Sequence, residues 1–311
     1  MEQPSLSHRY QATAFAELDE IIRDQKVWGF FKKSISDGYA ANAGDHIIAM
    51  NKLLDRAFDY VETSIKNGAK SGEIFKGLNE DIFRSGDKNF WFTKLYSNFK
   101  RNVKPNGVLN LYGGHLHGPR VLNIGCGDGI YSRILFDRGY KVTMADVIDF
   151  RDPSARDLPF QLMTQADLPF PDLFADTTLV MSVLHHVDPG EVIPLLQEVR
   201  RVSQRVIVEE ESYGIKENLN EFKQQIESDP RLREFIEMPV ADQIKYMKLL
   251  DYFSNVVIMN ISGMNFPFGY RTINEWRKIF ASVDFEVEKT ILIGFGRFHR
   301  TGRVAFILKR I

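Results

Sequence analysis

Hydrophobic positions change their spacing along the chain, and these changes divide the sequence into regions. Up to about residue 118, apolar residues recur every three or four positions, as in AFAELDEIIRDQKVWGFFKKSI, HIIAMNKLLDRAFDYVETSIKNG and NFWFTKLYSNFKRNV. This spacing predicts amphipathic helices, and Gly68 is a typical residue at the end of the second. The Gly- and Pro-containing stretches KPNG and YGGHLHGP predict loops. We therefore expect a helical region over residues 1–118.

Short apolar runs replace this pattern between residues 119 and 213. RVLNI, KVTMAD, PFQLM, TTLVMSV and RVIVEEE are rich in Val, Leu and Ile, and helix-like segments such as YSRILFDRG and PGEVIPLLQEVRRVS separate several of them. Strands that are buried on both faces read as continuous apolar runs, so this alternation predicts a parallel sheet covered by helices. The expected fold class is a doubly wound α/β sheet of the Rossmann-like kind.

The rest of the chain returns to helical spacing and then to mixed spacing. LNEFKQQIESDPRLREFIE and ADQIKYMKLLDYF predict helices, and TINEWRKIFASV predicts a further helix with Thr272 and Glu275 as its capping pair. FEVEKTILIGF and GRVAFILKR predict two final strands joined by GRFHRTG. The expected organisation is an N-terminal helical cap region, residues 1–118, and a core, residues 119–311, with a helical lid insertion at about 214–270.

Composition narrows the classes of partner. The 311 residues are 44% hydrophobic and carry a formal net charge of -1, so neither nucleic acid nor an anionic membrane is an expected partner. A single cysteine excludes an intramolecular disulfide framework and a Cys-based metal cluster. The first residues lack signal-peptide features, and no apolar run approaches the roughly 18 residues of a membrane span. We expect a cytoplasmic protein; the sequence indicates no oligomeric state.

The stretch VLNIGCGDGIYSRIL carries the first chemical signal. Gly125, Gly127 and Gly129 directly follow a predicted strand, where glycine permits a sharp turn and close approach of a ligand to the backbone. A P-loop would end in Gly-Lys-Ser/Thr, which is absent, and a dinucleotide loop would place glycine where Ile130 stands. Asp146 ends the next strand and can accept both ribose hydroxyls of an adenosine ligand. NAD and S-adenosylmethionine both meet this description.

Several motifs in order carry a family resemblance. VLNIGCGDG, an acidic strand end, DLPFPDLFADTTLVMSVLHHV and EVRRVSQRVIVEE together resemble the class I S-adenosylmethionine-dependent methyltransferases, nearest to the type 11-like branch that acts on small molecules. The resemblance implies an enzyme with S-adenosylmethionine as cofactor. It also implies seven strands with an antiparallel C-terminal strand, which dinucleotide dehydrogenases usually lack.

The resemblance also implies cofactor-binding residues. Gly125, Cys126 and Gly127 would lie against the methionine moiety, Asp146 would hold the ribose hydroxyls, and Val147 would lie beside the adenine. Either Thr164 or Asp167 would bond the adenine amino group, with Asp167 favoured, and Ser182 and Val183 would line the sulfonium region. Asn123 departs from the family pattern, which commonly has Asp at this position.

The residues after the fourth predicted strand are candidates for proton transfer. LHHV places His185 and His186 at the carboxyl edge of the sheet, and similar enzymes imply His186 as the group that acts on the acceptor. Glu209, Glu210 and Glu211 follow the fifth strand, where alternation would turn them to different faces. No metal site is expected, because His115 and His117 lack a nearby third ligand.

Aromatic residues suggest the kind of acceptor. They make up 12% of the chain and recur in the helical regions, where similar enzymes form caps that set acceptor choice; Tyr96 and Tyr270 are candidate substrate-binding residues. The main hypothesis is O-methylation of a small, hydrophobic metabolite in natural-product biosynthesis. The alternatives are N- or C-methylation of a small molecule, a non-catalytic binding or scaffold protein that keeps the fold, and an NAD-dependent oxidoreductase.

Overall fold

The computed structural model of the chain describes residues 6–84, 90–164, 166–261, 263–295 and 301–311. It divides into two compact units. The helical unit comprises Met1–Phe99, Ile226–Phe268 and Phe295–Thr301, and the sheet unit comprises Lys100–Gln225, Gly269–Gly294 and Gly302–Ile311. The limits drawn from the sequence, 1–118 and 214–270, fall at other residues, and that division into domains stays a prediction.

Helices build the helical unit, as the apolar spacing predicts. They are α1 (Leu6–Ile21), α2 (Gln25–Ala43), α3 (Ile47–Lys66), α4 (Ser71–Gly77), α5 (Phe90–Asn98), α10 (Pro230–Glu237) and α11 (Val240–Tyr252). The first predicted segment is two helices, because Asp24 caps the N-terminus of α2 by accepting bonds from the backbone of Lys26 and Val27. Helix α2 packs against α11, and Phe30 meets Tyr246 there with ring centroids 4.7 Å apart.

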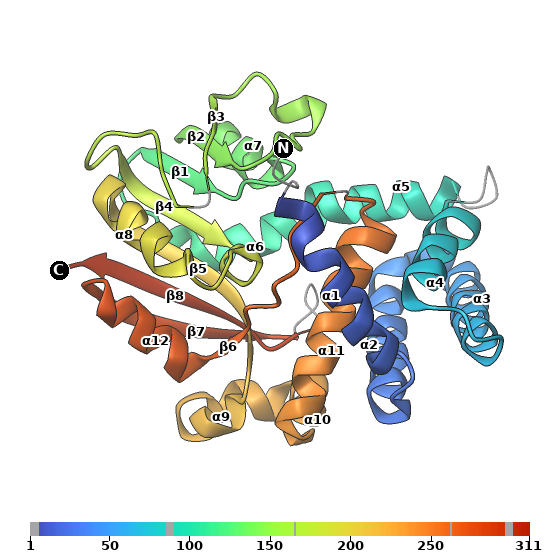
Figure 1. Ribbon diagram of the computed structural model, residues 1–311. Coiled ribbons are helices and arrows are strands. Elements are labelled where there is room, and N and C mark those ends of the chain that lie inside the picture. Colours follow the sequence, from blue (N-terminus) through green and yellow to red (C-terminus); the bar gives the residue numbers. More distant parts are fainter. Residues whose placement is uncertain (1–5, 85–89, 165, 262, 296–300) are drawn as a thin grey trace, which may run out of the picture. The chain divides into compact units, whose positions relative to one another are not determined.

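The sheet unit contains one sheet in the order β3-β2-β1-β4-β5-β8-β7 (Figure 1). Its strands are β1 (Arg120–Ile124), β2 (Lys141–Asp146), β3 (Phe160–Leu162), β4 (Ala175–Met181), β5 (Ser203–Tyr213), β7 (Phe285–Gly294) and β8 (Arg303–Arg310). The first five are parallel, whereas β8 runs antiparallel to both β5 and β7. This confirms the expected α/β sheet with an antiparallel C-terminal strand; the two-residue β6 (Arg271–Thr272) pairs with the end of β5.

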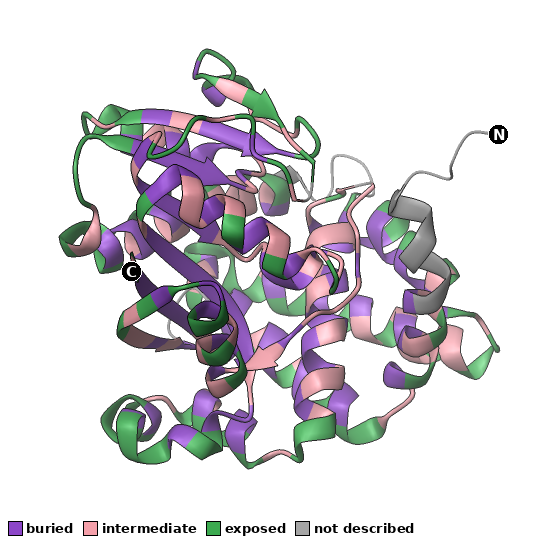
Figure 2. Ribbon diagram, turned by 60° about the vertical axis from the view of Figure 1, so that its left-hand side comes forward, coloured by how far each residue is buried: buried purple, intermediate pink, exposed green. Residues whose placement is uncertain are grey.

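Helices pack against the strands of this sheet. They include α7 (Ile130–Asp137), which packs against β2, α8 (Val192–Val202), which packs against β5, and α12 (Ile273–Ser282), which packs against β7. Helix α9 (Leu219–Ser228) lies in the segment between β5 and β6. The central strands are buried while the outer helix faces are exposed (Figure 2). Thr272 and Glu275 form the expected capping box of α12.

One loop prediction is wrong. KPNG opens helix α6 (Lys104–Tyr112), whose first turn contains Pro105. Proline is tolerated there because the first N–H groups of a helix have no intrahelical partner. Val108, Leu109 and Tyr112 of this helix are fully buried in the core of the sheet unit, so burial of this apolar face outweighs the local turn signal.

Strand order also fixes where a ligand can bind. Strand β1 lies between β2 and β4, so the chain leaves the carboxyl ends of these three strands side by side. In open α/β sheets this edge, where the strand order reverses, is the usual ligand site. The glycine loop, Asp146 and the LHH segment all follow these strand ends.

Candidate active site

The glycine loop after β1 combines one packed position with one open position. Gly125 and Gly127 have φ of 64° and 55°, in the left-handed region that favours glycine. A methyl group on Gly125 would lie 2.3 Å from Cγ2 of Val183, so the loops after β1 and β4 touch there. A methyl group on Gly127 would meet nothing within 4 Å. The loop therefore presents bare backbone to open space at Gly127.

Asp146 connects this loop to the end of β2. Its carboxylate accepts hydrogen bonds from the backbone N–H of Gly127 at 2.9 Å and of Val147 at 2.7 Å. Burial raises the pKa of Asp146, although backbone hydrogen bonds from Gly127, Val147 and Ile148 oppose the shift. Beside this buried carboxylate, Val147 is 45% exposed and Leu162 of β3 is 57% exposed. A polar group flanked by exposed apolar surface suits a ribose with its attached base.

The residues proposed for adenine recognition follow β3. The N–H of Met163 donates to the carbonyl of Asp146 at 3.0 Å, which holds the chain just before Thr164 next to Asp146. Asp167 precedes Leu168, whose N–H bonds Glu198 of α8 at 3.3 Å. Thr164 and Asp167 both have exposed side chains, and the choice between them stays a prediction.

Two residues of the loop fill structural roles. Asn123 is buried and donates to the hydroxyl of Ser132 at 2.9 Å, so the amide that replaces the family's usual Asp ties β1 to α7. Cys126 is buried, and burial raises the pKa of its thiol well above the usual range. A buried thiol that stays protonated is a poor nucleophile.

The chain makes a strained turn at the end of β4. Ser182 has φ of 56°, an uncommon value for a residue with a side chain, and its N–H donates to the carbonyl of Glu209 at 2.7 Å. The Ser182 hydroxyl oxygen is buried, and no hydrogen bond to a described residue satisfies it. A backbone held in this conformation next to the glycine loop is typical of a ligand-binding turn.

Glu210 holds the histidine segment that follows this turn. Its Oε1 accepts the N–H groups of Val183 at 3.0 Å and Leu184 at 2.7 Å, and its Oε2 lies 2.5 Å from Nδ1 of His185. His185 and Glu210 are both almost completely buried. The carboxylate thus orients the imidazole and fixes the backbone that carries it.

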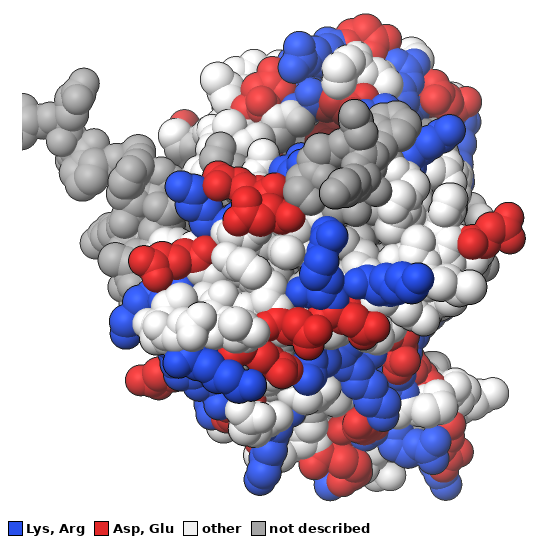
Figure 3. All heavy atoms as spheres, turned by 90° about the vertical axis from the view of Figure 1, so that its right-hand side faces the viewer, with Lys and Arg blue, Asp and Glu red and all other residues white. Residues whose placement is uncertain are grey.

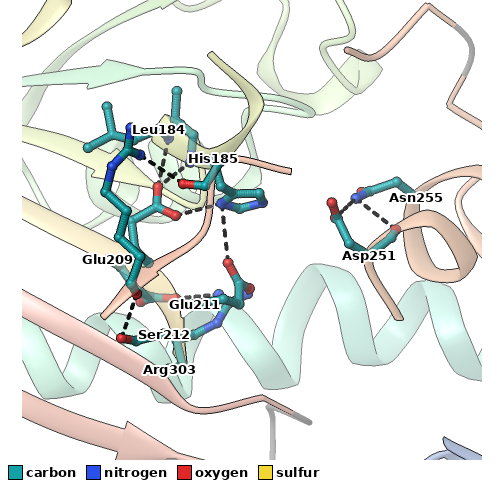
Figure 4. A network of polar contacts seen from close by, with 12 residues as sticks. Leu184, His185, Glu209, Glu211, Ser212, Asp251, Asn255 and Arg303 are labelled. Carbon is teal, nitrogen blue, oxygen red and sulfur yellow. Dashed lines mark hydrogen bonds and ion pairs between the residues drawn. The ribbon is translucent and has the colours of Figure 1, made fainter. Parts of the chain in front are cut away.

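A buried ionic network extends from this pair along β5. Arg303 of β8 donates to Glu209 and Glu211 (Figure 4). The Tyr112 hydroxyl also donates to Glu209. Burial alone would raise the pKa of Glu211, but the charges of Arg303 and His185 lower it to about 2. All three glutamates are buried. Glu209 and Glu211, two positions apart on the strand, both pair with Arg303, whereas Glu210 between them contacts His185.

Sequence reasoning missed Arg303 and the importance of Glu210. The available signal was an arginine at the start of the apolar strand GRVAFILKR, because arginine is almost never fully buried unless it is paired. Nδ1 of His185 and one carboxylate oxygen each of Glu210 and Glu211 lie within 4.8 Å of one another, a spacing that a metal ion could bridge. Hydrogen bonds and ion pairs already engage these groups, so the imidazole and the carboxylates have protein partners.

The other predicted residues fall in both units. His186 is half-buried, with its ring centroid 4.2 Å from that of His185. Tyr270 stacks on the other histidine, His185, at 5.1 Å, and the N–H of Gly269 donates to the His185 carbonyl at 2.9 Å. Tyr96 belongs to α5 of the helical unit, where it stacks on Phe92. The sheet unit therefore contains every predicted site residue except Tyr96.

Residues 122–205, from β1 into β5, match the family model described as "Methyltransferase domain". This match coincides with the glycine loop, Asp146 and the LHH segment on a sheet closed by an antiparallel strand. Residues 122–205 thus carry a methyltransferase domain, on a sheet with the antiparallel C-terminal strand that the resemblance to class I S-adenosylmethionine-dependent enzymes implies. The assignment also makes it an enzyme with S-adenosylmethionine as its cofactor.

Solved structures of methyltransferases are similar to this methyltransferase at low identity. An S-adenosylmethionine-dependent methyltransferase from Methanosarcina mazei is 18% identical, with 65% of this chain and 97% of that chain covered and a TM-score of 0.42. Magnesium protoporphyrin IX methyltransferase from Synechocystis is 16% identical, covering 77% and 99%, with a TM-score of 0.42. The Burkholderia thailandensis 1,6-didemethyltoxoflavin-N1-methyltransferase is 12% identical, with 70% of this chain and 86% of that chain covered and a TM-score of 0.45. No curated protein matches the sequence.

The methyltransferase assignment rests on the family match and the strand order. The described helices include none with the length and apolar character needed to span a membrane.

Proposed function

We propose that this methyltransferase O-methylates a small, hydrophobic metabolite in natural-product biosynthesis. The observation that carries the proposal is the half-buried His186, which directly follows a histidine held by a buried carboxylate at the carboxyl edge of the sheet. A hydroxyl needs help to lose its proton as its oxygen attacks, and histidine suits that task near neutral pH.

The residues at the sheet edge fit the cofactor. The open space at Gly127 would accommodate a ligand against the backbone, and the Asp146 carboxylate would accept the ribose hydroxyls beside the exposed Val147. Cys126, Ser182 and Val183 would complete the wall near the methionine end, where the Ser182 hydroxyl supplies a polar atom. When bound, S-adenosylmethionine supplies an electrophilic methyl group.

The two histidines would then divide the work. His185 acts as a positioning residue, because Glu210 and the ring of Tyr270 fix its imidazole. His186 accepts the proton of the acceptor hydroxyl as that oxygen attacks, and afterwards releases the proton to water. Much of the rate would come from holding the acceptor oxygen in line with the methyl group. With Tyr270 as a candidate substrate contact, this edge favours an apolar acceptor.

The distribution of charge agrees with a small-molecule acceptor. The formal net charge is -1, and on the face drawn in Figure 3 basic and acidic side chains are interspersed. Nucleic-acid partners usually require a clustered basic surface. N- or C-methylation is the second candidate, since a nucleophile that needs no base would use the same cofactor site.

Cofactor binding and product analysis test the proposal separately. Calorimetry should detect binding of S-adenosylmethionine and no comparable binding of NAD. Incubation with labelled S-adenosylmethionine and matched acceptors, for example a phenol and the corresponding aniline, should give a product methylated on oxygen by mass spectrometry. Methylation of the aniline alone would replace the O-methylation proposal with its N-methylation alternative.

A further inference from the structure

A cavity of about 220 Å³ lies within the helical unit, and its lining contains none of the residues assigned to the cofactor. It is lined by the end of α11 and the chain that follows: Tyr252, Val256, Asn260, Ile261, Gly263, Met264 and Phe266. The side chains in this lining carry no formal charge. The cavity is thus suited to a neutral guest.

Irregular backbone shapes this cavity. Phe253–Ile258 form a π-helix, a rare wide turn that often occurs at functional sites. The side chain of Asn79 donates to the carbonyls of Val257 at 2.7 Å and Val256 at 3.3 Å, and so stabilises the wide turn from outside. The chain then turns through positive φ at Asn260 (56°) and Gly263 (82°). These features hold the walls apart where a regular helix would continue.

Tyr252 supplies a polar group that the protein itself does not use. Its side chain is only 3% exposed, and its ring is fixed by Phe75 at 5.0 Å and Phe266 at 5.1 Å. The hydroxyl makes no hydrogen bond to any residue in the described part of the chain. Burial raises the pKa of Tyr252 to about 12, so the hydroxyl stays a donor at neutral pH. A hydroxyl in the wall of a cavity can donate to a guest.

We propose that this cavity binds a small neutral molecule with one aromatic or alicyclic ring and an oxygen atom that accepts a hydrogen bond from Tyr252. An apolar cavity of about 150 Å³ is enough to hold benzene, so a volume of about 220 Å³ admits a substituted ring. Val256, Ile261, Met264 and Phe266 contact the ring, and Tyr252 selects for the oxygen. This inference does not rest on the proposed methyl transfer, because none of the lining residues has a role in that proposal.

A matched pair of probes tests the site on the full chain without S-adenosylmethionine. 4-Methylphenol and para-xylene have the same shape, but only the first carries an oxygen. Ligand-observed NMR titration should show binding of both to the wild type. Tyr252→Phe should weaken 4-methylphenol about fivefold, the effect of one neutral hydrogen bond, and leave para-xylene unchanged.

Two further variants make the result specific. Tyr39→Phe removes another buried hydroxyl of the same unit outside the cavity lining, and it should change neither affinity. Met264→Trp should fill the cavity and abolish binding of both probes, with circular dichroism confirming that the variant is folded. The proposal is overturned if neither probe binds the wild type at millimolar concentration, or if Tyr252→Phe weakens both equally. Because no methyl transfer is measured, a failure here is distinct from a failure of the proposed function.

Discussion

Replacement of Glu210 probes the connection between the strand ends most directly. Its carboxylate is completely buried and accepts three hydrogen bonds, from the backbone of Val183 and Leu184 and from His185. Glu210→Ala would remove the carboxylate that accepts from all three donors. Glu210→Gln keeps the shape and one acceptor oxygen for the two backbone N–H groups, but removes the charge facing His185.

The structure sets the size of the effect. Removing one partner of a buried, hydrogen-bonded pair costs about 3–5 kcal/mol, and each further buried donor left unpaired costs about 1–3 kcal/mol. Relaxation and entry of water offset part of the sum, so we expect Glu210→Ala to lower the free energy of unfolding by about 4 kcal/mol. Glu210→Gln should cost about 1–2 kcal/mol, because only the interaction with His185 changes in kind.

Urea denaturation followed by circular dichroism measures these differences. Kinetics on Glu210→Gln then separate stability from positioning. The neutral amide should lower kcat at least tenfold while the affinity for S-adenosylmethionine stays within about twofold, because His185 loses its orienting charge but the cofactor loop is untouched. As a control, Glu288→Gln removes a carboxylate that pairs with Arg205 at the surface and should change neither quantity. An equal stability loss for the Ala and Gln variants, or an unchanged kcat for Gln, would refute this reasoning.

Four other changes test the remaining parts of the site. His186→Ala should lower kcat by about 10²–10⁴-fold with S-adenosylmethionine affinity unchanged in calorimetry; wild-type turnover would remove His186 as the base. Asp146→Ala should weaken S-adenosylmethionine by about tenfold or more, whereas the surface control Asp157→Ala should not, and equal affinities would contradict the ribose role. Gly127→Ala places a methyl group in the open space at this loop position of positive φ. It should weaken cofactor binding, measured by calorimetry, and lower the free energy of unfolding by about 1–2 kcal/mol, measured by urea titration. An unaffected affinity would place the cofactor elsewhere. The depressed pKa of Glu211, about 2 against an ordinary 4.5, contributes stability that is present above pH 4.5 and lost as the pH falls toward 2. Glu211→Gln should therefore make the free energy of unfolding, measured by urea denaturation, depend less on pH in that window. An unchanged pH dependence would show that Glu211 does not contribute.

The sequence by itself determined the features that are written in local patterns. Continuous apolar runs specified the buried strands, and Ile130 in place of glycine separated the loop from a dinucleotide fingerprint. The loop conformation agrees with this interpretation, because Gly125 and Gly127 adopt the positive φ that glycine permits at little cost. The capping pair Thr272 and Glu275 was also predictable, since all of its interactions lie within one helical turn.

Tertiary structure decided where polar groups find their partners. Arg303 neutralises Glu209 and Glu211 across about ninety residues of chain because β8 inserts next to β5, and no local pattern encodes that pairing. Helix α6 forms over KPNG because its apolar face is buried, which outweighs the local preference for a turn. Asn79 likewise bonds the π-helix beside the cavity at Tyr252 although it lies far away in the sequence. Periodicity determines which elements form, whereas the pairing of buried charges and the shape of a cavity depend on contacts that only the folded chain brings together.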